Sequence, residues 1–270
     1  MTMTKIIKKA VKPLINILIF LILLIISAAL LSPIYLTIMR SLGSPDFTAL
    51  NYIMLVFTQF ELPALFPRYL INTILVTVAV TVLQLWISTP AAYALAKIKF
   101  PGSVFLNKLV EIGLLFGASS FFVTQYIVLN KMRLINTFPA IILPVISTSL
   151  GVFLLRQFIM QIPDNLIETA RLDGVSNHVI CRDVIIPQIK PARVTLVIFA
   201  INAAWRAEVH NFVYSEKLKT LASVMRQIDI NEDTGVALAL AVVMMSLPLL
   251  AFMFMQNSVI ETMAHGKIKE

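Results

Sequence analysis

The chain has 270 residues, of which 59 % are hydrophobic and only 13 % are charged. Soluble domains carry about 25 % charged and about 45–50 % apolar residues. This composition, with a mean hydropathy of +0.88, excludes an ordinary soluble enzyme, a disordered protein and a nucleic-acid-binding module. The formal net charge of +8 is therefore expected at a membrane surface, and no nucleic-acid partner is expected.

Five charge-free stretches are long enough to cross a bilayer, which requires about 20 mostly apolar residues. A sixth stretch, 194–205, has only 12 charge-free residues, or about 18 Å of helix. It crosses the membrane only if the flanking charged side chains snorkel to the interfaces. We therefore predict an all-α membrane protein with six transmembrane helices. The five long stretches are 13–39, 69–96, 112–130, 134–155 and 234–260.

The basic residues predict the orientation of these helices. If the N-terminus is cytoplasmic, 14 of the 22 lysines and arginines fall in inside segments, as the positive-inside rule requires. Residues 1–12 are predicted to form a cytoplasmic amphipathic segment on the anionic inner leaflet, with a simple positive flank as the alternative. Residues 13–260 then form the six-helix transmembrane domain, and 261–270 form a cytoplasmic C-terminal tail.

The long inside loop, 161–190, has the pattern of two short helices. Asp164 is a plausible N-cap of the first, and Gly174 is the expected left-handed residue after its end. Ser176 can cap the second helix, which Pro187 is expected to end before the fifth span. A capped helix pair at the cytoplasmic surface predicts a docking surface for another protein. The alternative is an ordinary loop packed on its own bundle.

This loop resembles the EAA motif of ABC importer permeases. The motif has Glu-Ala-Ala, a glycine six residues after the glutamate, and a proline thirteen residues beyond the glycine. Here Glu168, Gly174 and Pro187 have this spacing, and Thr169 replaces the first alanine. The resemblance implies that the loop couples the permease to an ATPase through a set of five residues. These are Glu168, Ala170, Asp173, Gly174 and Pro187.

Three further segments resemble the permeases of carbohydrate importers. Residues 91–102 resemble the end of their second span, 134–137 the turn before the fourth, and 220–222 a Thr-Leu-Pro segment. The likeness is to the smaller, six-helix permease subunit of the maltose-type importer, although Trp205-Arg206 departs from the usual Trp-Asn. It implies a type I ABC importer permease fold in a bacterial or archaeal cytoplasmic membrane. It also implies a second permease subunit, an ATPase dimer and an extracytoplasmic solute-binding protein as partners.

The sequence contains no catalytic or metal-binding pattern. Its only Gly-Lys pair, Gly266-Lys267, has Glu261 where a P-loop needs a glycine. ATP and Mg²⁺ are therefore expected in the partner ATPase, and this chain is expected to be a transport subunit without cofactor. One cysteine and three scattered histidines predict no metal site.

Polar and aromatic residues inside the spans could line a path for a sugar, which offers hydroxyl groups for hydrogen bonds and C–H faces for stacking. For each residue, plain packing between helices is the simpler explanation. The candidates are Phe121, Phe122, Gln125, Tyr126, Asn202 and Trp205, with Arg206 and Glu208 at the outer end of the fifth helix.

The resemblance to carbohydrate permeases favours a sugar or oligosaccharide importer, and three alternative functions are weighed against it. One is import of a phosphorylated polyol or another small organic solute. A second is an ATP-independent secondary transporter, which would need an intramembrane carboxylate for ion coupling. The charge-free interiors of spans one, two, four and six argue against that mechanism. A membrane enzyme is disfavoured, because the sequence shows no nucleophile or metal pattern.

Overall fold

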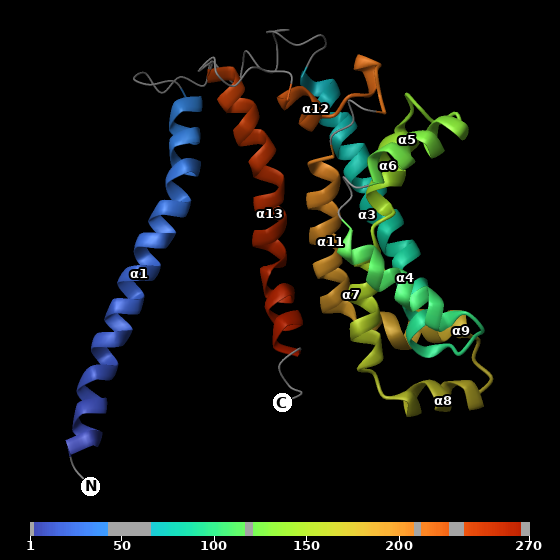
Figure 1. The fold of residues 1–270 in the computed structure, drawn as a ribbon, viewed down its shortest axis with the longest axis horizontal. Coiled ribbons are helices and arrows are strands. Elements are labelled where there is room, and N and C mark those ends of the chain that lie inside the picture. The colour runs from blue at the N-terminus through green and yellow to red at the C-terminus, as the bar shows by residue number, and fades with distance from the viewer. Residues whose placement is uncertain (1–2, 43–65, 117–120, 208–211, 227–234, 266–270) are drawn as a thin grey trace. The chain divides into compact units, whose positions relative to one another are not determined.

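The computed structural model describes residues 3–42, 66–116, 121–207, 212–226 and 235–265. Over these ranges every regular element is a helix, which confirms the all-α prediction. The chain divides into two compact units, Met1–Thr58 with Ile230–Val242, and Gln59–Asp229 with Val243–Glu270. The α-helices (Figure 1) are α1 (Met3–Ser41), α3 (Phe66–Lys97), α4 (Ser103–Leu115), α5 (Phe122–Lys131), α6 (Phe138–Ile146), α7 (Ser149–Met160), α8 (Asp164–Leu172), α9 (Asn177–Val179), α10 (Ile186–Gln188), α11 (Lys190–Trp205), α12 (Leu221–Met225) and α13 (Gly235–His265).

Two shorter elements complete the described chain. A π-helical segment, η2 (Ile180–Ile185), joins α9 to α10, and a 3₁₀ turn, η3 (Glu216–Leu218), precedes α12. In the first unit, α1 is one continuous helix, so the predicted N-terminal segment runs from Met3 into the first span without a break.

Four segments of the described residues are long and apolar enough to cross a membrane. They are Asn16–Ser41, Phe66–Lys97, Phe138–Met160 and Ala237–Asn257. A fifth is obtained if α9–α10 and α11, which meet at a bend of 85°, count as one span. Most apolar residues of α1 between Ile17 and Ile38 are exposed, as lipid-facing residues are.

The predicted third span is not one helix over the described residues. α4 ends at Leu115 with Phe116 in an extended conformation, and α5 starts at Phe122. The prediction of one continuous helix through 112–130 is therefore wrong at Phe116, and residues 117–120 of that stretch lie outside the described residues. Apolar composition indicates that a stretch can lie in a membrane, but it does not show that the helix is unbroken.

In the second unit, α3 packs against both α7 and α11, and Figure 1 shows the three helices side by side. Gly151 of α7 makes the close approach possible. A Cβ atom added to Gly151 would lie 2.4 Å from Gln84 Nε2 and 2.7 Å from Ser88 Oγ on α3. In membranes the hydrophobic effect contributes little to helix association, because lipid tails are as apolar as the helices. Small residues at a crossing stabilise the pair instead, since they let the two backbones pack closely.

Two apolar clusters hold the two ends of this bundle. One surrounds Val76 and Val80 of α3 and includes Ala140 of α6 and Phe212. The other packs the far end of α3 and α7 against the loop that follows α7. Its buried residues are Ala92, Tyr93, Leu155, Ile159, Ile162, Ile167, Ile180, Cys181, Ile185, Ile189, Ala192 and Leu196. This second cluster positions the helix pair that the sequence marks for coupling.

Candidate functional site

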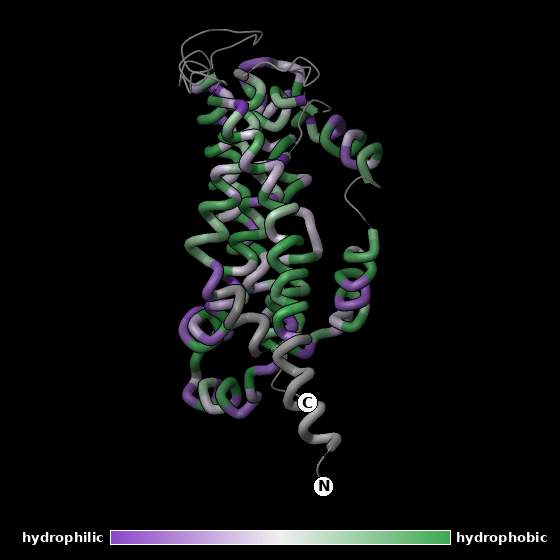
Figure 2. Tube along the Cα trace, turned by 90° about the vertical axis from the view of Figure 1, so that its left-hand side faces the viewer, coloured by the Kyte–Doolittle hydropathy of each residue, from purple (hydrophilic) through white to green (hydrophobic). Residues whose placement is uncertain are grey.

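The helix that carries the EAA-like residues, α8, is a short amphipathic helix that runs across the end of α7 (Figure 1). Its Ile167 is buried with 3 % exposure, and Ala170 packs against the same cluster. Glu168 and Asp173 are exposed, and Leu172 is 89 % exposed. Figure 2 shows hydrophilic and hydrophobic residues alternating along this lowest helix of the bundle. α8 thus has a buried face and an unpartnered face.

Gly174 ends α8 as predicted. Its φ is +76°, in the left-handed region, and an added Cβ atom would meet nothing within 4 Å. The Gly174 N–H donates to Arg171 O at 3.0 Å, and the Val175 N–H donates to Ala170 O at 3.1 Å. This pair of bonds is the Schellman motif, which glycine adopts without steric cost. The glycine is required here by backbone conformation and not by lack of space.

The start of α8 differs from the prediction, because Asp164 is not the N-cap. Pro163 occupies that position, and Asp164 is the first helical residue. The Asp164 carboxylate instead accepts a 2.6 Å bond from Lys97 Nζ at the end of α3. Lys97 Nζ also donates to Ile162 O at 2.6 Å. The pairing lowers the pKa of Asp164, chiefly through the hydrogen bond from Lys97.

Asn177 forms a second link between the loop and α3. Its Oδ1 accepts from Tyr93 Oη of α3 at 3.2 Å and from Arg171 Nη2 of α8 at 3.5 Å. A hollow of about 580 Å³ lies between these groups and is lined by Lys97, Glu168 and Arg171 among others. Lys97 and Asn177 therefore tie both helices of the loop to α3.

Sequence reasoning did not assign Tyr93, Lys97 or Asn177 to the coupling site. A signal was present, because Tyr93 and Lys97 lie in the 91–102 segment that resembles the carbohydrate permeases. Contact between that segment and α8 is set by the tertiary fold, since 67 residues separate Lys97 from Asp164.

The second helix of the loop has the predicted bounds to within one residue. Asn177 to Gln188 is helical, with a π-helical stretch in the middle, and Ser176 occupies the N-cap position, although its side chain makes no capping hydrogen bond. Pro187 is the last residue but one of this helix, and the chain bends at Ile189 before α11. Ile180, Ile185 and Ile189 anchor this helix in the core, each at most 1 % exposed.

The described path residues make separate contacts within this chain. Phe122 and Tyr126 of α5 pack in the cluster around Phe212, and the Phe122 and Phe212 rings are 5.4 Å apart. Trp205 is 2 % exposed, and its Nε1 donates to Met244 O of α13 at 2.8 Å. Asn202 Nδ2 donates within its own helix, to Ile198 O.

The remaining path residues that the structure describes differ in exposure. Phe121 and Arg206 are exposed, and Gln125 is half-buried. Glu208 lies outside the described residues.

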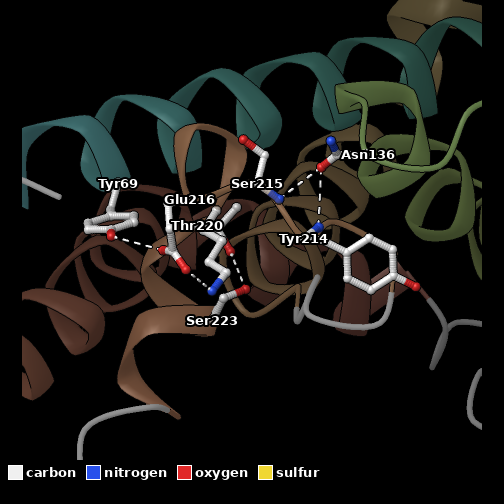
Figure 3. Close-up of polar contacts among 8 residues, drawn as sticks. Tyr69, Asn136, Tyr214, Ser215, Glu216, Thr220 and Ser223 are labelled. Carbon is white, nitrogen blue, oxygen red and sulfur yellow. Dashed lines mark hydrogen bonds and ion pairs between the residues drawn. The ribbon is translucent and has the colours of Figure 1, made fainter. Parts of the chain in front are cut away.

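A polar network that sequence reasoning did not assign lies at the start of α3, at the opposite end from Lys97 and α8. Figure 3 shows its contacts. Tyr69 Oη donates to Glu216 Oε2 at 3.3 Å, and Lys219 pairs with the same carboxylate. Asn136 has φ +63°, and its Oδ1 accepts from the backbone N–H groups of Tyr214 and Ser215 at 3.2 and 2.9 Å.

Asn72 of α3 also binds this network, because its Nδ2 donates to Lys217 O and to Lys219 O, both at 2.9 Å. The network fixes the loop before α12 onto α3. Asn136 and Thr220 fall in two of the segments that carry the family resemblance.

The bundle, its apolar spanning helices and the exposed helix held at one end define a multi-pass membrane transport subunit. A family model described as "Binding-protein-dependent transport system inner membrane component" matches residues 88–261, and the chain belongs to this family.

Known relatives and solved structures agree with this assignment. The chain is 30 % identical over 216 residues to Protein LplC of Bacillus subtilis, covering 73 % of this chain and 72 % of LplC. It is 28 % identical over 170 residues to the arabinooligosaccharides transport system permease AraQ of Halalkalibacterium halodurans, covering 63 % and 58 % of the two chains. The crystal structure of a bacterial ABC transporter involved in the import of the acidic polysaccharide alginate contains a chain of the same fold. The TM-score is 0.76 at 20 % identity, over 92 % of this chain and 96 % of that one.

Proposed function

We propose that this chain is the permease subunit of an ATP-driven ABC importer for a sugar or oligosaccharide that an extracytoplasmic binding protein delivers. The family match supports the transport role. The names of AraQ and of the alginate transporter support a carbohydrate cargo. A second permease subunit and an ATPase dimer complete the proposed complex. ATP and Mg²⁺ bind to that dimer, and this chain supplies no catalytic group.

The observation that carries the proposal is the exposed face of α8. Leu172, at 89 % exposure, and Leu166, at 45 %, are apolar side chains among the otherwise polar exposed residues of α8. Exposed apolar groups rimmed by polar ones mark protein contact sites. Glu168 and Asp173 supply the polar rim. We assign this face to the ATPase and α8 to the role of coupling helix.

The proposed topology has six spans with both termini in the cytoplasm. In it, α4 and α5 belong to the third span, and α11 with the bent segment before it forms the fifth. α8 then lies at the cytoplasmic surface, and the network around Glu216 lies outside.

The links to α3 suggest how motion passes from the ATPase to the spans. Closure of the ATPase dimer on ATP displaces α8, and Lys97 and Asn177 transmit the displacement to α3. The ATPase drives such a two-state change only if it contacts α8 differently in the two states. Phe122, Gln125, Tyr126 and Asn202 stay in this proposal as candidates for the substrate path.

The coupling role is tested by comparing two glycines of positive φ. Gly174 has φ +76° and Gly102, in the turn before α4, has φ +91°, and neither has an atom within 4 Å of an added Cβ. Valine at either position therefore costs about 1–2 kcal/mol or more through backbone strain alone. Gly174→Val is expected to abolish both transport and the stimulation of ATP hydrolysis by loaded binding protein.

Gly102→Val is the matched control and is expected to keep both activities at equal expression. Binding-protein docking should survive in both variants, because neither glycine lies in a span or at the outer surface of the proposed topology. If Gly174→Val transports and stimulates ATP hydrolysis like Gly102→Val, the helix pair is not the coupling element.

A further inference from the structure

A groove of about 890 Å³ runs along α3 beside the α9–α10 segment, apart from the exposed face of α8. Its α3 wall includes Val82, Trp86 and Tyr93, and its other wall includes His178, Arg182 and Arg193. The α3 residues from Val82 to Ala94 that line it span about 18 Å along the helix axis. Half of a bilayer's hydrocarbon core is about 15 Å thick. The groove therefore reaches from the hydrocarbon core into the headgroup region.

The end of the groove that lies deeper in the membrane is apolar and open to the bilayer. Val82 is 59 % exposed, Trp86 is 74 % exposed and Ile87 is 46 % exposed. They lie in the middle part of a helix that crosses the membrane. An acyl chain is the apolar group that a bilayer presents to such a surface.

The other end of the groove is cationic. Arg193 of α11 lines it, and its Nε is buried without a hydrogen-bond acceptor among the described residues. A buried donor without an acceptor is rare in native proteins and indicates a missing group. Arg182 is neutralised by Asp183, at 2.7 and 2.9 Å. Arg193 therefore carries the net charge at this end, with His178 beside it.

We infer that this groove binds an anionic phospholipid, with the phosphate at Arg193 and one acyl chain along Val82 and Trp86. Basic pockets between membrane helices are suited to anionic headgroups. A partner protein would match the apolar wall but leave Arg193 without an acceptor unless it supplied a buried anion. The proposal rests on the proposed function only in naming this membrane surface cytoplasmic.

Trp86 provides a direct probe, because the chain has two tryptophans and Trp205 is 2 % exposed. The full chain is reconstituted in nanodiscs of ordinary phosphatidylcholine. One of two lipids with brominated acyl chains, either phosphatidylglycerol or phosphatidylcholine, is then added in increasing fractions. Bromine quenches tryptophan fluorescence on contact. Half-maximal quenching is expected at about tenfold less brominated phosphatidylglycerol than brominated phosphatidylcholine, the size of one charge-assisted hydrogen bond.

Arg193→Gln is expected to remove this preference, and Arg193→Lys, which keeps the charge, is expected to retain it. Lys190→Gln is the matched control, since exposed Lys190 lies one turn away and does not line the groove. Equal quenching by both lipids, or a preference that persists in Arg193→Gln, overturns the proposal. So does loss of quenching by both lipids when the second permease subunit is added, because that result assigns the groove to a subunit contact. The Gly174 variant must keep the preference, so failure of the coupling role is distinguishable from failure of the lipid site.

Discussion

At the scale of single residues, Lys97 is the link on which the coupling account depends. Its side chain is 7 % exposed, and it donates to both Ile162 O and Asp164 at the start of α8. Because Lys97 holds the pKa of Asp164 below its ordinary value of 3.8, the carboxylate favours folding above that value. Its contribution is lost only as the pH falls through the lowered pKa. The link is therefore intact throughout the physiological range.

Lys97→Met is expected to lower the stimulation of ATP hydrolysis by loaded binding protein by about fivefold or more, the lower end of typical coupling between sites. Lys99→Met is the control, since Lys99 is exposed two residues further on. Asp164→Asn should cause a smaller loss, because Lys97 keeps its bond to Ile162 O, and the double variant should lose no more than Lys97→Met alone. Additive losses would show that Asp164 acts through a contact other than Lys97.

At the scale of helices, the end of α8 was predictable and its start was not. A glycine after a short helical run is a local signal, and the positive φ of Gly174 follows from it. The contact of Asp164 with Lys97 is long-range, so local capping rules misplaced the aspartate. Pro187, in contrast, marks the end of its helix to within one residue, since the helix ends at Gln188 and the chain bends at Ile189.

Gly151 tests the packing of α3 against α7. Gly151→Ala places a Cβ atom 2.4 Å from Gln84 Nε2 and 2.7 Å from Ser88 Oγ, so overpacking should destabilise the bundle by about 1–3 kcal/mol. A lower midpoint of thermal aggregation in detergent measures this loss. Adding Gln84→Ala removes the nearest clashing atom and should restore part of the midpoint. If Gly151→Ala leaves the midpoint of thermal aggregation unchanged, α3 and α7 do not approach each other as closely as described.

At the scale of the whole molecule, composition was sufficient to predict an all-helical membrane protein, and the family followed from the resemblance of the loop with Glu168, Gly174 and Pro187 to the EAA motif. The third span was predicted less well, because hydropathy reports apolar length and not helical continuity, which is interrupted at Phe116. The path for substrate stays a prediction. Trp205 and Phe122 were grouped by residue type, but Trp205 bonds to α13 while Phe122 packs against Phe212.

The measurement that tests the central claim most directly is photocrosslinking from Leu172 in the assembled transporter. A photoreactive phenylalanine analogue replaces Leu172, which is 89 % exposed on α8, or Phe254, which is 85 % exposed on α13, as a matched control. The account predicts that the Leu172 probe captures the ATPase subunit, with a yield that changes between nucleotide-free and ATP-bound states, and that the Phe254 probe does not. Capture of the binding protein from Leu172, or no capture of the ATPase in either state, would contradict the assignment of α8 as the coupling helix.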